Sequence, residues 1–311
     1  MNTFKPEGAI IKSVKNIDYT KTIDGLKRAY EKQITLEGIA AMCDHDFNLH
    51  VSLPCNIPAI IPKSEALYTA TGEDAKDIAI LTRVGKPVCF KVVGFKTRCG
   101  EVVAILSRRL AQKECYDEYI SNLAPGDIVG AKITHLESFG AFADIGCGII
   151  SLLSIDSISV SRISHPRERL MVGDEILAVV KSRDELSRIN ISMRELLGSW
   201  SENASLFSEG ETVGGIVRGI ESYGIFIELT PNLAGLAEYK DNVERGQIAA
   251  VYIKSIIPDK MKIKLIIIDT RDADEERMPF NYFIDTATTT RINSWQYSPP
   301  SCKKIVESIF T

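Results

Sequence analysis

The stretch GDIVGAKITHLESFGAFADIG, residues 126–146, decides the fold of this protein. Short runs rich in Val, Ile and Phe are bounded in it by Gly, Asp and Ser, a pattern typical of short β-strands joined by tight turns. SLLSIDSISV at 151–160 adds one more run, and VGDEILAVVKSRDELSRINISM at 172–193 adds two. Five strands in about 70 residues predict a small closed barrel.

The same order of parts occurs three times along the chain. A downstream copy occupies residues 210–268, and its opening, GETVGGIVRGIESYGIFIEL, follows the opening of the middle copy closely. A weaker upstream copy at 37–112 keeps the strand order but carries the insertion YTATGEDAKDIAIL at 68–81. The sequence therefore predicts a mainly β chain with three tandem five-stranded barrels, the first of them degenerate.

Helical segments are expected around and between the barrels. Apolar spacing predicts a helix over 21–32, and the connectors at 111–124 and 194–209 are typical of short helical linkers. Trp295 and Tyr297 in the tail are expected to pack on the third barrel, with binding of a base as the alternative. The expected organisation is an N-terminal helical segment (1–33), a degenerate barrel (34–115), a barrel with the best motif match (124–196), a divergent barrel (208–270) and a C-terminal tail (271–311).

Composition restricts the classes of function. The 311 residues carry a net charge of −4, so nucleic acid binding would have to be local. No signal peptide and no apolar run of membrane-spanning length is present, which predicts a cytoplasmic protein without a membrane partner. The seven cysteines lack metal-ligand spacing and are expected to be reduced and mostly buried. Cys43 with His45 and His50 is the one cluster resembling metal or nucleophile chemistry, and it lacks a third ligand.

Two phenylalanines in the string SFGAF form the first candidate site. Phe139 and Phe142 are three residues apart, so strict strand alternation would send them to opposite faces of the sheet. A bulge at Gly140 would bring both rings to one face, where unpaired bases can stack. The alternative is that one or both rings fill the barrel core.

A charged turn forms the second candidate site. Asp184 and Arg188 flank the turn DELSR, where Arg188 could contact phosphate or a base and Asp184 could orient it. A solvated hairpin ion pair is the alternative. Arg162, Arg167 and Arg169 form a basic group that is either a phosphate-binding rim or an ordinary loop.

These elements together resemble the RNA-binding repeat of the ribosomal protein S1 family, an OB-fold barrel. The matching elements are G-x-x-V from Gly126, S-F-G-A-F, V-G-D from Val172 and D-x-x-x-R-I-x-I-S from Asp184. The resemblance covers about two-thirds of the chain. It implies an RNA face built from two aromatics of the second strand, a histidine on the third, and the Asp and Arg of the last hairpin.

Carried over residue by residue, this face has one clear departure in the middle unit, where Ser154 stands at the histidine position. The third unit has Glu238 at that position and Asp259 with Lys262 in a shortened hairpin, while the first has Pro62 and no aromatic pair. The RNA-binding candidates are Phe139, Phe142, Ser154, Asp184, Arg188, Lys132, Arg162, Tyr223, Phe226 and Lys262.

The resemblance implies a single-stranded RNA or messenger RNA binding protein of the translation apparatus, with the small ribosomal subunit as a candidate partner. An RNA-processing or transcription accessory factor and a protein-interaction scaffold with degenerate barrels are the alternatives. Nucleotide-binding and hydrolase motifs are absent from the sequence, so no catalysis, cofactor, metal or small-molecule substrate is expected.

Overall fold

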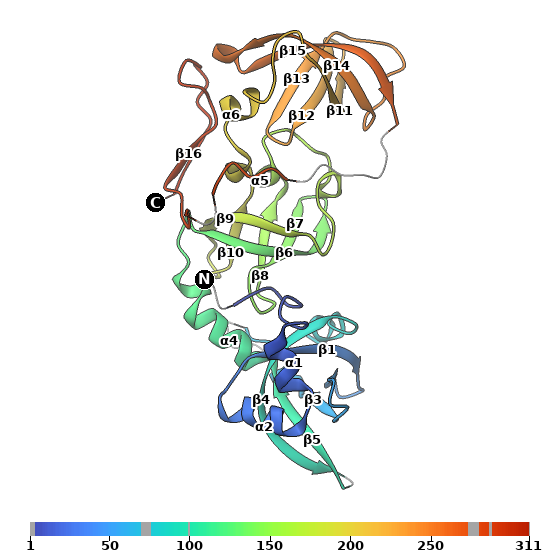
Figure 1. Cartoon of the computed structure of the whole chain (residues 1–311), viewed down its shortest axis with the longest axis vertical. Helices are drawn as coiled ribbons and strands as arrows, with labels where there is room; N and C mark the ends of the chain where they lie inside the picture. The colour runs from blue at the N-terminus through green and yellow to red at the C-terminus, as the bar shows by residue number, and fades with distance from the viewer. Residues whose placement is uncertain (1–3, 70–75, 99, 273–279, 286–287, 311) are drawn as a thin grey trace. The chain divides into compact units, whose positions relative to one another are not determined.

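The computed structural model of the protein describes residues 4–69, 76–98, 100–272, 280–285 and 288–310 (Figure 1). It contains three closed five-stranded barrels and a two-stranded hairpin in the tail. In each barrel the strands follow the order one, two, three, five, four, and the third and fifth strands are parallel. This is the topology of an OB-fold barrel, so the predicted fold class is confirmed.

The chain folds into two compact units. The first comprises Met1–Leu123, Gly130–Lys132 and Asp144–Ile150, and the second comprises Ala124–Val129, Ile133–Ala143 and Ser151–Thr311. None of the described helices combines the length and apolar character needed to cross a membrane.

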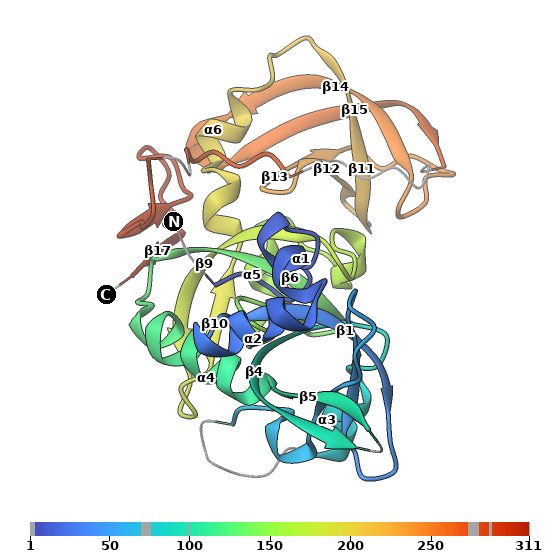
Figure 2. The ribbon, with the colours of Figure 1, turned by 60° about the horizontal axis from the view of Figure 1, so that its bottom comes forward.

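The first barrel lies in the first unit, together with the N-terminal helices. Thr22 caps the N-terminus of α2 by accepting the Gly25 N–H at 3.0 Å, and Leu26 and Ala29 of α2 are buried in the core of this barrel. Figure 2 shows α2 beside β4 of the barrel. The predicted helix over 21–32 is thereby confirmed. The elements are α1 (Val14–Thr20), α2 (Ile23–Glu31), β1 (Leu36–Cys43), β2 (Leu49–Ser52), β3 (Ala59–Ile61), α3 (Asp77–Leu81), β4 (Pro87–Arg98), β5 (Glu101–Ser107) and α4 (Arg108–Glu118).

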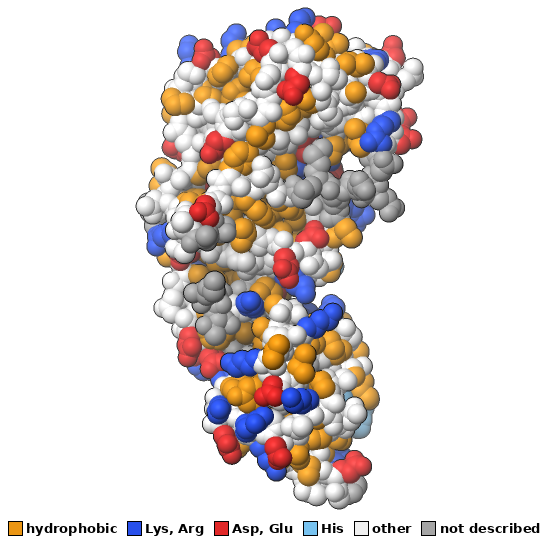
Figure 3. Space-filling model, in the orientation of Figure 1, with side chains coloured by type: hydrophobic (Ala, Val, Ile, Leu, Met, Phe, Trp, Pro, Cys, Tyr) orange, Lys and Arg blue, Asp and Glu red, His pale blue; other side chains and the backbone are white. Residues whose placement is uncertain are grey.

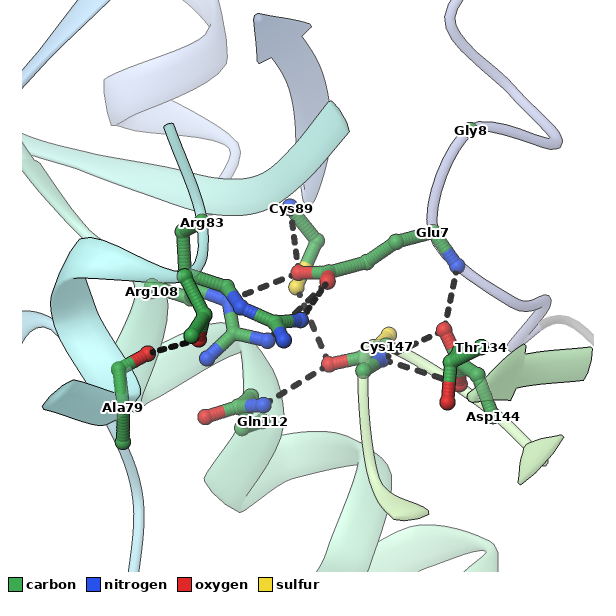
Figure 4. A network of polar contacts seen from close by, with 12 residues as sticks. Glu7, Gly8, Ala79, Arg83, Cys89, Arg108, Gln112, Thr134, Asp144 and Cys147 are labelled. Atoms are coloured by element: carbon green, nitrogen blue, oxygen red, sulfur yellow. Dashed lines mark hydrogen bonds and ion pairs between the residues drawn. The ribbon is translucent and has the colours of Figure 1, made fainter. Parts of the chain in front are cut away.

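A buried ion pair fastens the N-terminal segment within the first unit (Figure 4). Both carboxylate oxygens of Glu7 accept hydrogen bonds from Arg108, at 2.7 and 3.0 Å, and one also accepts the Cys89 N–H at 3.0 Å. The Glu7 N–H donates to Asp144 at 2.7 Å. Burial alone would raise the pKa of Glu7, but Arg108 holds it below its usual value. Removal of one partner of such a pair leaves an uncompensated buried charge.

The middle and third barrels contain the remaining long strands. The middle barrel consists of β6 (Ile128–Glu137), β7 (Gly140–Asp144), β8 (Ile150–Ser154), β9 (Glu175–Arg183) and β10 (Ile189–Ser192), with α5 (Ile155–Ile158) after β8. The helix α6 (Trp200–Ala204) lies in the predicted linker. The third barrel consists of β11 (Thr212–Glu221), β12 (Gly224–Thr230), β13 (Leu233–Ala237), β14 (Ile248–Ile257) and β15 (Lys262–Arg271).

Asn232, at the turn before β13, is fully buried and connects segments of the second unit. Its side-chain amide donates to the carbonyl oxygens of Arg194 and Gly198 at 2.7 and 2.8 Å, and its side-chain oxygen accepts the Val160 N–H at 3.0 Å. Its own carbonyl oxygen accepts the Tyr297 hydroxyl at 2.6 Å. These bonds join the linker, the loop after α5, the third barrel and the tail.

The tail packs as expected. Its hairpin is formed by β16 (Ser294–Gln296) and β17 (Glu307–Ile309). Trp295 and Tyr297 belong to the buried core cluster of the third barrel, so the predicted packing of these two side chains is confirmed.

Burial of Glu37 on β1 makes the stability of the protein depend on pH. Burial raises the pKa of Glu37 to about 7, and the N–H groups of Gly8 and Ile10, which donate to its two oxygens, offset this only in part. The folded protein therefore holds a proton that the unfolded chain releases at lower pH. The free energy of unfolding should fall by about 1–3 kcal/mol as pH rises from about 5 to above 7.

The substitution Glu37→Gln should flatten this slope, because the amide does not titrate. The slope should persist in part, since burial also raises the pKa of Asp144 to about 7. At pH 5 the variant should be about 1–3 kcal/mol less stable, because the amide offers a single acceptor to the two N–H groups. Urea unfolding at a series of pH values measures both effects. Glu31→Gln, at an exposed glutamate of α2, is the matched control, and equal slopes for the two variants would contradict the assignment.

Candidate nucleic-acid interface

Phe139 and Phe142 form an aromatic pair on the middle barrel. Their ring centroids lie 6.0 Å apart with the planes at 87°, and Phe139 is 54% exposed. Phe139 lies in the two-residue turn between β6 and β7 and is therefore free of strand alternation, so the pair needs no bulge at Gly140. The predicted meeting of the two rings is confirmed, and the turn accounts for it.

Gly140 is needed for a different reason. A Cβ atom on Gly140 would lie 2.5 Å from the carbonyl oxygen of Leu153 on β8, well inside contact distance. The Phe139 carbonyl also accepts the Ile155 N–H at 2.9 Å. The missing side chain thus allows the end of β8 to approach the turn and hold Phe139 in place.

His135 is a candidate that the sequence alone did not reveal. It lies on β6, 61% of its side chain is exposed, and its ring stacks on Phe142 with centroids 6.3 Å apart and planes at 24°. Its Nε2 atom lies 2.7 Å from a carboxylate oxygen of Glu137. The middle barrel therefore has an aromatic nitrogen ring beside the pair, although Ser154 replaces the histidine expected on β8. The sequence gave no signal that His135 lies beside Phe142, because that contact depends on the register between β6 and β7.

Asp184 shapes the last hairpin of the middle barrel and holds Arg188. One carboxylate oxygen accepts the N–H groups of Leu186 and Arg188, both at 2.9 Å, and the other accepts Nε of Arg188 at 2.7 Å. The backbone bond from Arg188 and its guanidinium keep the pKa of Asp184 below its usual value. Arg188 is 68% exposed in its side chain and directly precedes β10, the neighbour of β8.

The other candidates of the middle barrel lie in different surroundings. Ser154 is half-buried, and its hydroxyl is hydrogen-bonded to the hydroxyl of Ser157 at 2.9 Å. The ammonium of Lys132 donates to the backbone carbonyl of Glu7 at 3.4 Å. Arg162 is exposed. Their roles toward RNA stay predictions.

Arg169 does not belong to a phosphate-binding rim. It is buried, and two of its guanidinium nitrogens donate to the two carboxylate oxygens of Glu228 at 2.6 and 2.7 Å. Arg218 donates to the same carboxylate at 2.8 Å and to Glu168 at 2.7 Å. Of the three arginines of the predicted basic group, Arg162 and Arg167 are exposed, whereas Arg169 has a structural role.

The third barrel repeats the aromatic geometry. Tyr223, in the turn before β12, and Phe226 have centroids 6.1 Å apart with planes at 89°. Strand register adds a residue that the sequence did not indicate: Phe226 lies opposite Leu236 on β13, which lies opposite Lys264 on β15. Lys262 is exposed at the first position of the same strand.

The first barrel has no Phe, Tyr or Trp on its second strand, β2, and its Tyr30–Phe95 contact joins α2 to β4 instead. Its β1–β2 loop is organised by Asp44, whose side chain accepts the N–H groups of Asp46 and Asn48 and lies 3.2 Å from His50. The Cys43 thiol contacts the Asp44 carbonyl at 3.7 Å. Within the described ranges, no group of three or more His, Cys, Asp or Glu side chains is arranged to hold a metal ion.

The substitution Gly140→Ala should destabilise the protein by about 2–4 kcal/mol, because the added methyl group forces β8 away from the turn. Gly130→Ala is the matched control, since a Cβ on this exposed glycine of β6 meets nothing within 4 Å. Urea unfolding of both variants tests the assignment. A Gly140→Ala variant as stable as the control would show that the close approach is not required.

The comparisons with known proteins agree with this geometry. Residues 122–194 match the family model of the S1 RNA binding domain. The small ribosomal subunit protein bS1 of Rhizobium meliloti is 29% identical over 197 residues, covering 58% of this chain and 34% of the relative. The bS1 protein of Streptococcus pneumoniae is 29% identical over 206 residues, covering 58% of this chain and 51% of the relative.

A multidomain protein with nucleic acid binding domains from Streptococcus pneumoniae is a similar solved structure. It is 13% identical, with 76% of this chain and 73% of that chain covered, at a TM-score of 0.25. The match to the family model and the OB-fold topology of the middle barrel together show that residues 122–194 form an S1 domain, and more than half of the chain is similar to bS1 proteins.

Proposed function

We propose that this protein binds single-stranded RNA, with the middle barrel as its main stacking site. The observation that carries the proposal is the aromatic pair of exposed Phe139 and half-buried Phe142, with His135 stacked beside it. Aromatic rings on a barrel face stack unpaired bases of any sequence, at about 1–3 kcal/mol per base. The site is thus suited to recognising single strands with little sequence preference.

Arg188 would supply the charge that this site needs. Asp184 binds its Nε atom, and in the described part of the chain its two terminal nitrogens have no hydrogen-bond partner, so they can donate to phosphate. On the face shown in Figure 3, acidic and basic side chains are interspersed. Attraction to RNA would therefore be confined to a few positions, as expected for a net charge of −4.

We infer a role in translation, in which the protein captures messenger RNA in the cytoplasm near the small ribosomal subunit. The similarity to proteins named as small ribosomal subunit protein bS1 supports this inference, although the chain covers only 34–51% of the relatives cited above. A binding role without catalysis follows from the same proposal. A scaffold role is the second candidate for the first barrel, whose second strand, β2, carries no Phe, Tyr or Trp.

Alanine at both Phe139 and Phe142 should weaken binding of a single-stranded oligouridylate by at least tenfold, because two stacking surfaces are lost. Fluorescence anisotropy at low salt measures the affinity, and a thermal melt checks that the variant folds. Unchanged affinity in a folded variant would contradict the proposal.

The matched variant carries alanine at Tyr223 and Phe226, the same geometry on the third barrel. We expect a smaller loss, because that barrel lacks the ring corresponding to His135 and the Asp–Arg hairpin. Equal losses for the two double variants would overturn the ranking of the barrels.

Co-sedimentation with 30S subunits separates a translation role from an RNA-processing role, since only the translation role predicts enrichment in ribosomal fractions.

A further inference from the structure

A cationic groove lies where the tail meets the hairpin between β14 and β15. The groove has a volume of about 520 Å³, and Lys260 from the hairpin and Lys303 and Lys304 from the tail line it. We propose that this groove binds the phosphodiester backbone of single-stranded RNA, as a second contact that the tail adds to the third barrel. This inference rests on the proposed RNA-binding function.

The hairpin side of the groove is held in a defined conformation. Pro258–Lys260 forms one turn of 3₁₀ helix, and Met261 follows with a left-handed φ of 48°. Met261 packs against the core cluster of the third barrel. The hairpin therefore presents Lys260 and Lys262 from a fixed backbone, at the place where the middle barrel carries Asp184 and Arg188.

The tail side is equally well anchored. The Cys302 N–H donates to the Pro299 carbonyl at 3.0 Å and closes a turn just before Lys303. Val306 is bonded to the strand side of the tail, since its carbonyl accepts the Tyr297 N–H at 2.8 Å and its N–H donates to the side-chain hydroxyl of Ser298 at 2.7 Å. Because Tyr297 is buried in the third barrel, the two tail lysines are held beside the hairpin.

The described side chains that line the groove carry a net positive charge. Lys260, Lys303 and Lys304 are exposed, Asp259 is the one carboxylate lining the groove, and none of these lysines forms a salt bridge with another described residue. Like charges gathered on fixed backbone repel one another, and a polyanion relieves this repulsion by displacing counterions. In a chain with a net charge of −4, such a concentration of positive charge favours a specific anionic ligand.

Continuity with the aromatic pair favours RNA over an acidic protein segment. Lys262 and Lys264 continue from the groove along one face of β15, and Lys264 lies in register with Leu236 and Phe226. Two strand spacings separate Lys264 from Phe226, about 10 Å. A single strand whose bases stack on Tyr223 and Phe226 can thus lay its phosphates along the lysines, a combination that a peptide would not use.

The double variant Lys303→Gln, Lys304→Gln tests the proposal in the full chain. Binding of labelled oligouridylate is measured from about 50 to 300 mM KCl. Loss of two phosphate contacts should make the slope of log affinity against log salt shallower by about 1.4 and lower the affinity at about 0.1 M salt by about tenfold. The control Lys86→Gln, Lys96→Gln has the same net charge and changes two exposed lysines of the first barrel, so its slope should equal that of the wild type.

The outcomes separate the groove from the proposed function. If the wild type binds RNA and the folded Lys303/Lys304 variant has the same affinity and slope, the groove is not an RNA contact, while the proposed function stands. If the wild type fails to bind at 50 mM salt, both are wrong. If poly-glutamate protects Lys303 and Lys304 from reductive methylation as well as oligouridylate does, the groove serves an acidic protein partner and the RNA assignment is overturned.

Discussion

The aromatic face of a barrel depends on one close contact. The second strand of the barrel begins with a glycine, and a backbone carbonyl of the third strand lies against that glycine. In the middle barrel the Leu153 carbonyl occupies the space of a Cβ on Gly140, and in the third barrel the Ala237 carbonyl does the same at Gly224, each at 2.5 Å. Only glycine permits this distance. The turn before that glycine is thereby fixed, so its aromatic residue projects beside the aromatic residue three positions later. Two barrels of different sequence arrive at nearly the same ring geometry for this reason.

Buried ion pairs limit which basic residues remain for RNA. Arg108 and Arg169 are each committed to a carboxylate away from solvent, Glu7 and Glu228 respectively. Charges in such surroundings are costly to separate, so these arginines serve packing and not recognition. The arginine and lysines at the hairpins, Arg188, Lys260 and Lys262, stay exposed, and the proposals above give them contacts with phosphate.

Local pattern was enough to predict the barrels, because strand runs, turn residues and their order repeat along the chain. It also found the aromatic pair and the Asp184–Arg188 turn, which are close in sequence. It missed His135 and Lys264, whose places in the face follow from register between strands, and register is set by closure of the whole barrel. Local pattern also could not show that Arg169 is buried while Arg162 is exposed, because Glu228, the partner of Arg169, is 59 residues away in the sequence. Local contacts are predictable from sequence, and contacts made by tertiary closure are not.

Under the proposals made above, the middle and third barrels bind RNA by different contacts. The middle barrel offers stacking surfaces with one arginine, whereas the third offers a weaker aromatic pair with a row of lysines extended by the tail. Weak sites on one chain gain affinity because binding at one raises the effective concentration of RNA at the other. Base stacking depends little on salt concentration, whereas phosphate contacts weaken as salt rises. The middle barrel would therefore contribute more at high salt, and the third barrel more at low salt. An acidic protein can hold RNA in this way without a generally basic surface, since each contact needs only a locally favourable potential.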